Sequence, residues 1–248
     1  MSGHSKWSTI KHKKGAVDAK RGRIFTKVIK EITVAARLGG GDPTGNPRLR
    51  RALDLARSNN MPADNVARAI KKGTGELEGV HYEELMYEGV GPAGTLVMCE
   101  VVTDNRNRSA AEMRKIFDKH NGQMGAAGSA AWAFDTKGQI SIELSAATEE
   151  QLFEVAVGAG AEDVESDGDS WWITTPPDVL DAVRDALNTA TIAIQNAELA
   201  RVPKTPKTLS GRDLEVGMSL VEALEDHDDV QKVHIDFEPS DEALASLS

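Results

Sequence analysis

Residues 18–41 read DAKRGRIFTKVIKEITVAARLGGG, and this stretch decides the architecture of the N-terminal third of the chain. Apolar residues recur at the spacing of one helix face, and three consecutive glycines end the pattern after Leu38. We therefore predict a helix over residues 18–38. Its apolar arc consists of Ile24, Phe25, Val28, Ile29, Ile32 and Ala36.

The opposite arc of this helix is basic. It consists of Lys20, Arg23, Lys27, Lys30 and Arg37. A solvated helix face usually alternates acidic and basic residues four positions apart, but Asp18 and Glu31 are the only acids in this stretch. The pattern favours a stripe that faces phosphate groups over a face that is merely solvated.

Two shorter helices follow. Asn46 and Pro47 are typical of a helix start, and Pro62 opens a further helix that ends at Gly73. Residues 18–73 therefore predict a three-helix unit. The preceding residues 3–14 have no periodicity and combine cations with Trp7. Two interpretations remain open for them: a disordered tail, or an arm that orders on nucleic acid with Trp7 stacked on a base.

Charge divides the chain unequally. The net charge is -10 over 248 residues, yet residues 1–75 contain 17 Lys+Arg and 5 Asp+Glu, whereas the remainder contains 12 and 34. A basic segment attracts polyanions and an acidic one repels them. Contact with nucleic acid is therefore expected in the first third of the chain.

Composition excludes several classes of protein. Charged residues make up 27 % and apolar residues 40 %, as in ordinary globular proteins. Cys99 is the only cysteine, which excludes an internal disulfide and a cysteine-based zinc site. No uncharged stretch is long enough to span a bilayer, and the basic N-terminus lacks the apolar run of a secretory signal. We expect a cytoplasmic protein with no membrane partner.

After residue 79 the pattern becomes that of strands. Strands are predicted at 82–88 and 95–103, joined by GVGPAG, which matches the dinucleotide-binding pattern but precedes a strand and so indicates a hairpin turn. Ser109 and Glu112 then have the spacing of a capping box. Arg106 and Arg108 lie just before that helix and form a candidate anion-binding pair, with local salt bridges as the alternative.

The rest of the chain predicts an insertion. Residues 138–202 show the order β-α-β-β-α-β of a ferredoxin-like domain, which begins with a predicted strand at 139–144 and a predicted helix at 149–157. The tail supplies only a helix at 214–225 and a strand at 230–237, which can complete the sheet of the preceding unit. The predicted fold class is α+β with three domains, one of them ferredoxin-like and inserted in another. The expected domains are 1–75, 80–135 plus 203–238, and 138–202.

Catalytic motifs are missing from the sequence. The six histidines form no metal-ligand spacing, and neither a P-loop nor a nucleophile elbow occurs. We expect a protein that is not an enzyme and has no cofactor, no catalytic metal and no small-molecule substrate.

Several strings along nearly the whole chain carry a family resemblance. They include GHSKW at residues 3–7, IFTK at 24–27, NPRLR at 46–50, AIKKG at 69–73, TDNRNR at 103–108 and DDV at 228–230. With them the sequence resembles the YebC/PmpR family of probable transcriptional regulators, whose mitochondrial members are translational activators. The resemblance implies three domains, no catalysis and one of two roles: regulation of transcription through promoter DNA, or assistance to ribosomes at difficult stretches such as proline runs.

The partner is therefore expected to be nucleic acid, either DNA or ribosomal RNA, and in the second case the ribosome. The basic helix offers almost pure cation, which suits backbone contact and RNA, whereas the family's usual designation favours DNA and transcription. The candidate nucleic-acid-binding residues are His4, Lys6, Trp7, Lys11, His12, Lys13, Lys14, Lys20, Arg21, Arg23, Lys27, Lys30, Arg37, Arg48, Arg50, Arg51, Arg57, Lys71 and Lys72.

Overall fold

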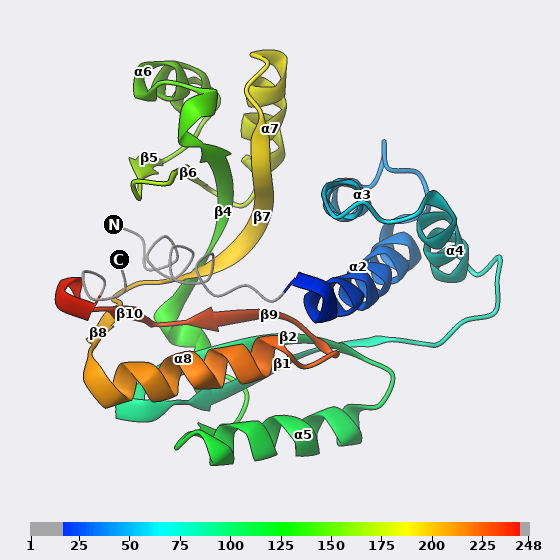
Figure 1. Ribbon diagram of the computed structural model, residues 1–248. Helices are drawn as coiled ribbons and strands as arrows, with labels where there is room; N and C mark the ends of the chain where they lie inside the picture. The colour runs from blue at the N-terminus through cyan, green and yellow to red at the C-terminus, as the bar shows by residue number, and fades with distance from the viewer. Residues whose placement is uncertain (1–16, 244–248) are drawn as a thin grey trace. The chain divides into compact units, whose positions relative to one another are not determined.

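The computed structural model describes residues 17–243, which form two compact units. The first, called here the N-terminal unit, comprises Ala16–Trp132 and Ser210–Ile235. The second, called the inserted unit, comprises Ala133–Leu209 and the tail that begins at Asp236. Figure 1 shows that the chain leaves the first unit, builds the second and returns. The predicted α+β class with an inserted ferredoxin-like part is confirmed.

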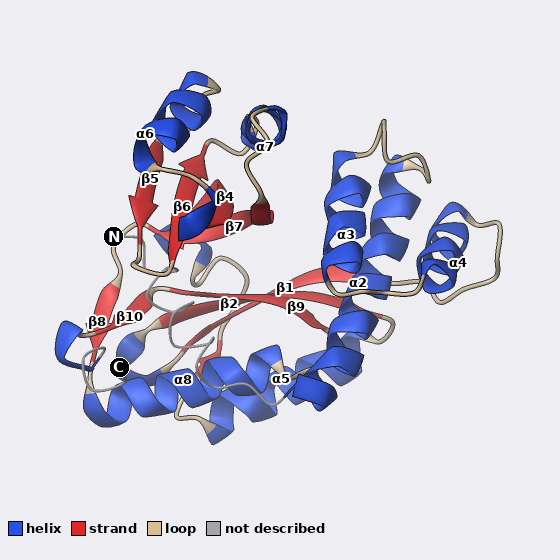
Figure 2. Cartoon of the chain, turned by 45° about the horizontal axis from the view of Figure 1, so that its top comes forward, coloured by secondary structure: helices blue, strands red, loops and turns tan. Residues whose placement is uncertain are grey.

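The N-terminal unit contains a helical bundle and a sheet (Figure 2). Its helices are α2 (Val17–Gly39), α3 (Pro47–Ser58), α4 (Ala63–Thr74), α5 (Arg106–Lys119) and α8 (Gly211–Glu225). Its strands are β1 (Glu83–Val90), β2 (Leu96–Thr103), β3 (Gln123–Met124) and β9 (Val230–Ile235). They form an antiparallel sheet in the order β3-β1-β2-β9, so the returning tail completes this sheet.

Helix α2 is the centre of the bundle because it is covered on more than one side. Val28 and Ile32 pack with Leu49 of α3 and Ala69 of α4 in one core cluster. Val34, on a different side of α2, is also fully buried. A helix covered over most of its circumference cannot present a continuous polar face to solvent.

One carboxylate fastens α2 to the sheet. Asp229 lies just before β9, and its Oδ1 is 2.6 Å from Lys30 Nζ. Its Oδ2 accepts hydrogen bonds from Ser109 Oγ at 2.7 Å and Arg108 Nη2 at 3.0 Å. Lys30 also donates to the carbonyl oxygens of Asp228 and Val102. Burial opposes the charged form of Asp229, but these hydrogen bonds outweigh it and hold the pKa of Asp229 well below its usual value.

The inserted unit is a four-stranded antiparallel sheet in the order β5-β6-β4-β7. Its elements are β4 (Phe134–Glu143), α6 (Glu149–Leu152), β5 (Asp163–Ser166), β6 (Ser170–Thr175), α7 (Leu180–Thr189) and β7 (Ile194–Pro203). Ile140, Ile173, Leu152 and Leu187 are fully buried in one core between strands and helices. Beyond it, β8 (Lys207–Leu209) pairs in parallel with β10 (Phe237–Pro239). The element order is that of the predicted ferredoxin-like domain.

Three local predictions need correction. Strand β4 begins at Phe134, because β7 extends far enough to pair with it from that residue onward. The predicted helix at 149–157 is α6 followed by a π-helical turn, Phe153–Val157. Ser109 does not cap a helix, because α5 begins earlier: Asn105 caps it by accepting a hydrogen bond from the backbone N–H of Arg108. The β8–β10 pair is an addition that the sequence pattern does not predict.

The domain boundaries 1–75, 80–135 plus 203–238, and 138–202 remain a prediction that a deletion can test. Phe134 and Pro203 are cross-strand partners, and Lys204 N donates to Ala133 O at 2.9 Å. A short Gly/Ser linker from Phe134 to Lys204 can therefore bridge the ends of the insertion. We expect this variant to unfold cooperatively in urea, monitored by circular dichroism.

The matched control for the deletion is a chain that ends at Val202. It lacks α8 and β9, so it exposes an edge of β2 and part of the core of the N-terminal unit. It should not unfold cooperatively. Equal stability of the two variants would show that the sheet does not depend on the returning tail.

Asp229→Asn tests the anchor of α2. The amide keeps the size of the side chain but leaves the buried ammonium of Lys30 without a counter-charge, which typically costs about 3–5 kcal/mol. We expect a loss of that size in the free energy of unfolding. Asp54→Asn, which breaks an exposed pair with Arg57, should cost less than about 1 kcal/mol.

The same substitution should change the pH dependence of stability. A lowered folded-state pKa contributes stability that is present above the ordinary value of 3.8 and is lost as the pH falls through the folded value. Below about pH 4 the wild type should therefore lose stability more steeply than Asp229→Asn. Parallel pH profiles would contradict the role given to this carboxylate.

Candidate nucleic-acid interface

The basic arc of α2 faces protein for much of its length. Arg23 forms an ion pair with Asp226, and Lys27 Nζ donates to the carbonyl oxygen of Glu225 at 2.6 Å. Both of these acceptors lie at the C-terminal end of α8, where the helix dipole attracts cations. Lys30 is only 8 % exposed and is held by Asp229. The prediction that Lys30 faces phosphate is wrong, and Arg23 and Lys27 already have partners within the N-terminal unit.

Arg48 also makes contacts that hold elements of the fold together. Its guanidinium donates to both carboxylate oxygens of Glu31, at 2.7 and 2.8 Å, and to Glu84 at 2.6 Å. Hydrogen bonding to Glu31, and then to Glu84, raises the pKa of Arg48 despite its burial. This side chain links α3 to α2 and β1, so it is a poor candidate for phosphate contact.

The remaining predicted cations of the bundle lie nearer to solvent. Arg37, Lys71 and Lys72 are exposed, and Arg50 and Arg51 are half-buried. Arg57 is exposed and pairs with Asp54 on the same helix. Gly73 allows the last turn of α4 to approach α2, since a Cβ there would lie 2.4 Å from Thr33 O. Arg37 of α2 and the two lysines of α4 therefore lie on helix turns that are close to each other.

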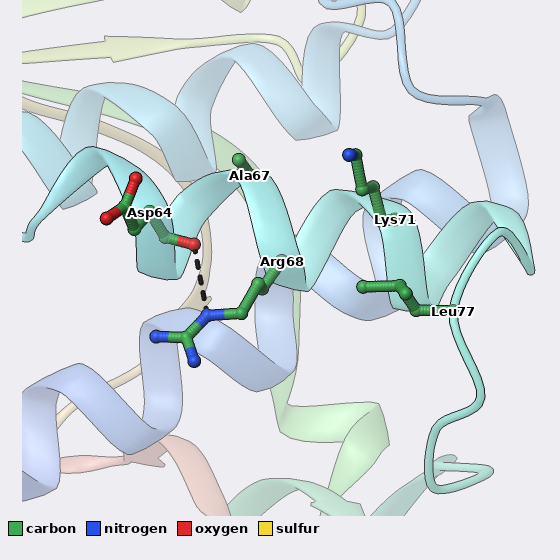
Figure 3. Close-up of a pocket in the computed structure, with 5 residues that line it drawn as sticks. All are labelled: Asp64, Ala67, Arg68, Lys71 and Leu77. Atoms are coloured by element: carbon green, nitrogen blue, oxygen red, sulfur yellow. Dashed lines mark hydrogen bonds between the residues drawn. The ribbon is translucent and has the colours of Figure 1, made fainter.

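A shallow groove of about 470 Å³ runs along α4 (Figure 3). Four of its lining residues, Asp64, Ala67, Arg68 and Lys71, recur at helical spacing on α4, and Leu77 after the helix completes the lining. Gly75, with φ +83°, ends the helix, and Leu77 N then donates to Lys71 O at 3.1 Å, which folds the chain back along α4.

Arg68 is a residue of this groove that does not belong to the predicted set. Its guanidinium donates to Asp64 O at 3.3 Å (Figure 3). It also donates to Asn65 Oδ1 at 2.6 Å, and the two hydrogen bonds hold the side chain along the helix. The sequence does contain a signal for Arg68: it lies three residues before Lys71, so both cations are on one face of the helix.

Several candidates lie beyond the described side chains. His4, Lys6, Trp7, Lys11, His12, Lys13 and Lys14 lie outside the described residues. Lys20 and Arg21 belong to α2, but their side chains are not among those described. Their contact with nucleic acid stays a prediction.

The two arginines of the candidate anion-binding pair have different surroundings in the fold. Arg108 donates to Asp104 at 2.8 Å and to Asp229 at 3.0 Å, and these hydrogen bonds raise its pKa. These contacts are the salt-bridge alternative, and anion binding by the half-exposed Arg108 stays a prediction. Arg106 is exposed, and its backbone carbonyl accepts a hydrogen bond from the hydroxyl of Tyr87 at 3.2 Å.

One group of possible metal ligands occurs among residues 17–243. It comprises Glu112, His227 and Asp229, whose ligand atoms lie within 4.8 Å of one another. His227 Nε2 is 2.8 Å from Glu112, and its Nδ1 accepts from the backbone N–H of Asp229. Because both ring nitrogens are hydrogen-bonded and Lys30 and Arg108 already neutralise Asp229, this group is suited to hold the chain rather than a cation.

No helix in the described part of the chain has the length and apolar character needed to cross a membrane.

Comparison with known proteins gives relatives over the whole length. Residues 5–76 match the TACO1/YebC protein N-terminal domain, and residues 82–237 match the TACO1/YebC second and third domain. A protein of Desulfosudis oleivorans is 56 % identical over 97 % of this chain and 98 % of its own, and one of Trichlorobacter lovleyi is 55 % identical over both whole chains. Each is named a probable transcriptional regulatory protein.

A solved structure is similar as well. The crystal structure of the conserved hypothetical protein Aq1575 from Aquifex aeolicus has a TM-score of 0.85 and 43 % identity, and the match covers 91 % of this chain and 93 % of that one. Together with the family models that match both parts of the sequence, these similarities show that the chain belongs to the TACO1/YebC family.

Proposed function

We propose that this protein is a non-enzymatic regulator of gene expression that binds nucleic acid through its bundle and its basic N-terminal segment. The observation that carries the proposal is the groove on α4. There Arg68 and Lys71 stand beside the apolar Ala67 and Leu77, and Asp64 is the one carboxylate of the lining. Cations suit phosphate oxygens, and small apolar side chains suit the sugars between them.

The names of the relatives support a regulatory role. They describe probable transcriptional regulators, which favours DNA as the target. The enzyme class receives no support from the site, since the groove offers two cations, two apolar side chains and the single carboxylate of Asp64, but neither a nucleophile nor an arranged acid–base pair.

The chemistry of the bundle favours backbone recognition over base reading, and so supports RNA or the ribosome as a second candidate target. Side chains that read base edges are commonly Arg combined with Asn or Gln. Residues 1–75 contain no Gln. Asn46 caps α3, and Asn65 accepts a hydrogen bond from Arg68. Cations that contact phosphates rather than base edges bind many sequences with similar affinity.

Replacing Arg68 and Lys71 by Gln should weaken binding to any RNA or duplex DNA. The slope of log affinity against log salt should fall by about 0.7–0.9 for each phosphate that the variant no longer neutralises. Filter binding at several salt concentrations measures both quantities, and circular dichroism checks that α4 stays helical.

The matched control carries the same change of charge. Arg23→Gln with Lys27→Gln removes two cations that already pair with the end of α8. This variant should lose stability but keep its affinity. If only the control weakened binding, α2 rather than α4 would carry the nucleic-acid interface.

A competition assay at fixed salt distinguishes the two targets. We expect weak discrimination among duplexes and preference for structured or single-stranded RNA, with Trp7→Ala weakening RNA binding by about 1–3 kcal/mol because base stacking is removed. Specific DNA binding instead requires about a thousandfold preference over random duplex. A promoter fragment that outcompetes random duplex and ribosomal RNA, with Trp7→Ala silent, would establish DNA as the target.

A further inference from the structure

Glu88 organises an exposed loop between β3 and β4. Its side chain is only 6 % exposed, and its carboxylate accepts hydrogen bonds from the backbone N–H groups of Gly128 at 2.8 Å, Ala130 at 2.6 Å and Ala131 at 2.9 Å. The carbonyl of Glu88 accepts a fourth from Gly125 N at 2.8 Å. A buried carboxylate requires several donors to offset its desolvation, so the loop and Glu88 stabilise each other.

The loop has one defined shape. Ser129 N donates to Ala126 O at 3.1 Å to close a turn, and Gly128 has φ +85°, a value that glycine adopts without strain. Gly125 packs against the Ser129 side chain, since a Cβ there would lie 2.4 Å from its Oγ. These contacts fix the backbone on which the next residues stand.

The loop holds the exposed indole of Trp132 in a fixed orientation. Trp132 is 68 % exposed, the largest fraction among the exposed large apolar side chains described. Its Nε1 donates to Ser129 O at 3.0 Å, within the loop that Glu88 holds. A single exposed aromatic is ordinary, but here a buried charge, a left-handed glycine and an indole hydrogen bond all hold it in position.

We propose that Trp132 is a stacking platform for an unpaired nucleobase. The inference rests on the proposed function and adds a site to it. Protein-binding tryptophans sit within a ring of surrounding contacts that exclude water, whereas the exposed loop residues that precede Trp132 in the sequence are small: Gly125, Ala126, Ala127 and Gly128. Stacking on a base requires only the face of the ring.

The loop that carries Trp132 has no charged side chain that would repel a polyanion. Residues 121–134 contain no charged side chain, although residues 76–248 as a whole are strongly acidic. The one carboxylate bound to the loop, that of Glu88, is buried beneath three N–H donors. A nucleic-acid strand would therefore meet no exposed carboxylate within the loop itself.

The test uses the full chain and a single-stranded RNA of about a dozen nucleotides, within the range of known site sizes. Trp132→Ala should weaken binding by about fivefold to a hundredfold, the range expected for one stacked base. Trp132→Phe should weaken it less. Phe153→Ala removes another exposed aromatic, 55 % exposed in the inserted unit, and should leave affinity unchanged.

An abasic strand of the same length separates stacking from other effects. It keeps the phosphates but has no ring to stack on, so Trp132→Ala should not weaken its binding. An equal loss of affinity for both strands would show that the ring acts through the fold and would overturn the inference. A changed oligomeric state of Trp132→Ala in sedimentation would overturn it in favour of contact between copies.

Fluorescence gives a direct readout. With Trp7, Trp171 and Trp172 replaced by Phe, the emission of Trp132 should be quenched as RNA binds. Glu88→Gln should weaken binding and loosen the ring, seen as lower fluorescence anisotropy, while thermal unfolding checks that the fold persists. Tight binding without quenching would overturn this inference alone, whereas absence of any binding would overturn the proposed function and this inference together.

Discussion

The buried pair of Lys30 and Asp229 is the constraint on which the N-terminal unit depends. An ammonium and a carboxylate are both costly to remove from water, so each must be satisfied completely. Lys30 has three oxygen acceptors, and Asp229 binds Ser109 and Arg108 of α5 as well. Because Asp229 immediately precedes β9, one carboxylate fixes α2, α5 and the last strand of the sheet. The bundle and the sheet consequently form one unit.

Because of this packing, the opposite charges of the two parts of the sequence partly offset each other within the fold. The end of α8 carries Glu225, Asp226 and Asp228 close to the last carbonyl groups of the helix, an arrangement that the helix dipole disfavours. Arg23 and Lys27 of α2 supply the compensating positive charge. Part of the basic character of residues 1–75 therefore stabilises the fold, and among the described side chains the exposed cations of α3 and α4, together with Arg37 of α2, remain for a polyanion.

Local periodicity explains which elements the sequence predicts well. Helix α2, the β1–β2 hairpin and the element order of the inserted unit follow from spacing within single segments. Periodicity cannot tell a solvated face from one packed against a distant element, which is why the prediction for Lys30 fails. A capping pattern is equally ambiguous when another capping residue lies nearby: Asn105, four residues before Ser109, starts the helix. Strands β8 and β10 have three residues each, too few for a period.

For the loop that carries Trp132, too, the local sequence is not enough to predict the structure. Its Gly- and Ala-rich sequence is typical of close backbone approach or of mobility, because nothing local distinguishes a free loop from one held by a distant carboxylate. Glu88, about forty residues earlier in the chain, supplies that carboxylate and restricts the loop. Once the backbone is fixed, less conformational entropy is lost when the indole binds a ligand. A buried anion that accepts backbone N–H groups thus both keeps the surface of the loop uncharged and orients its one large side chain.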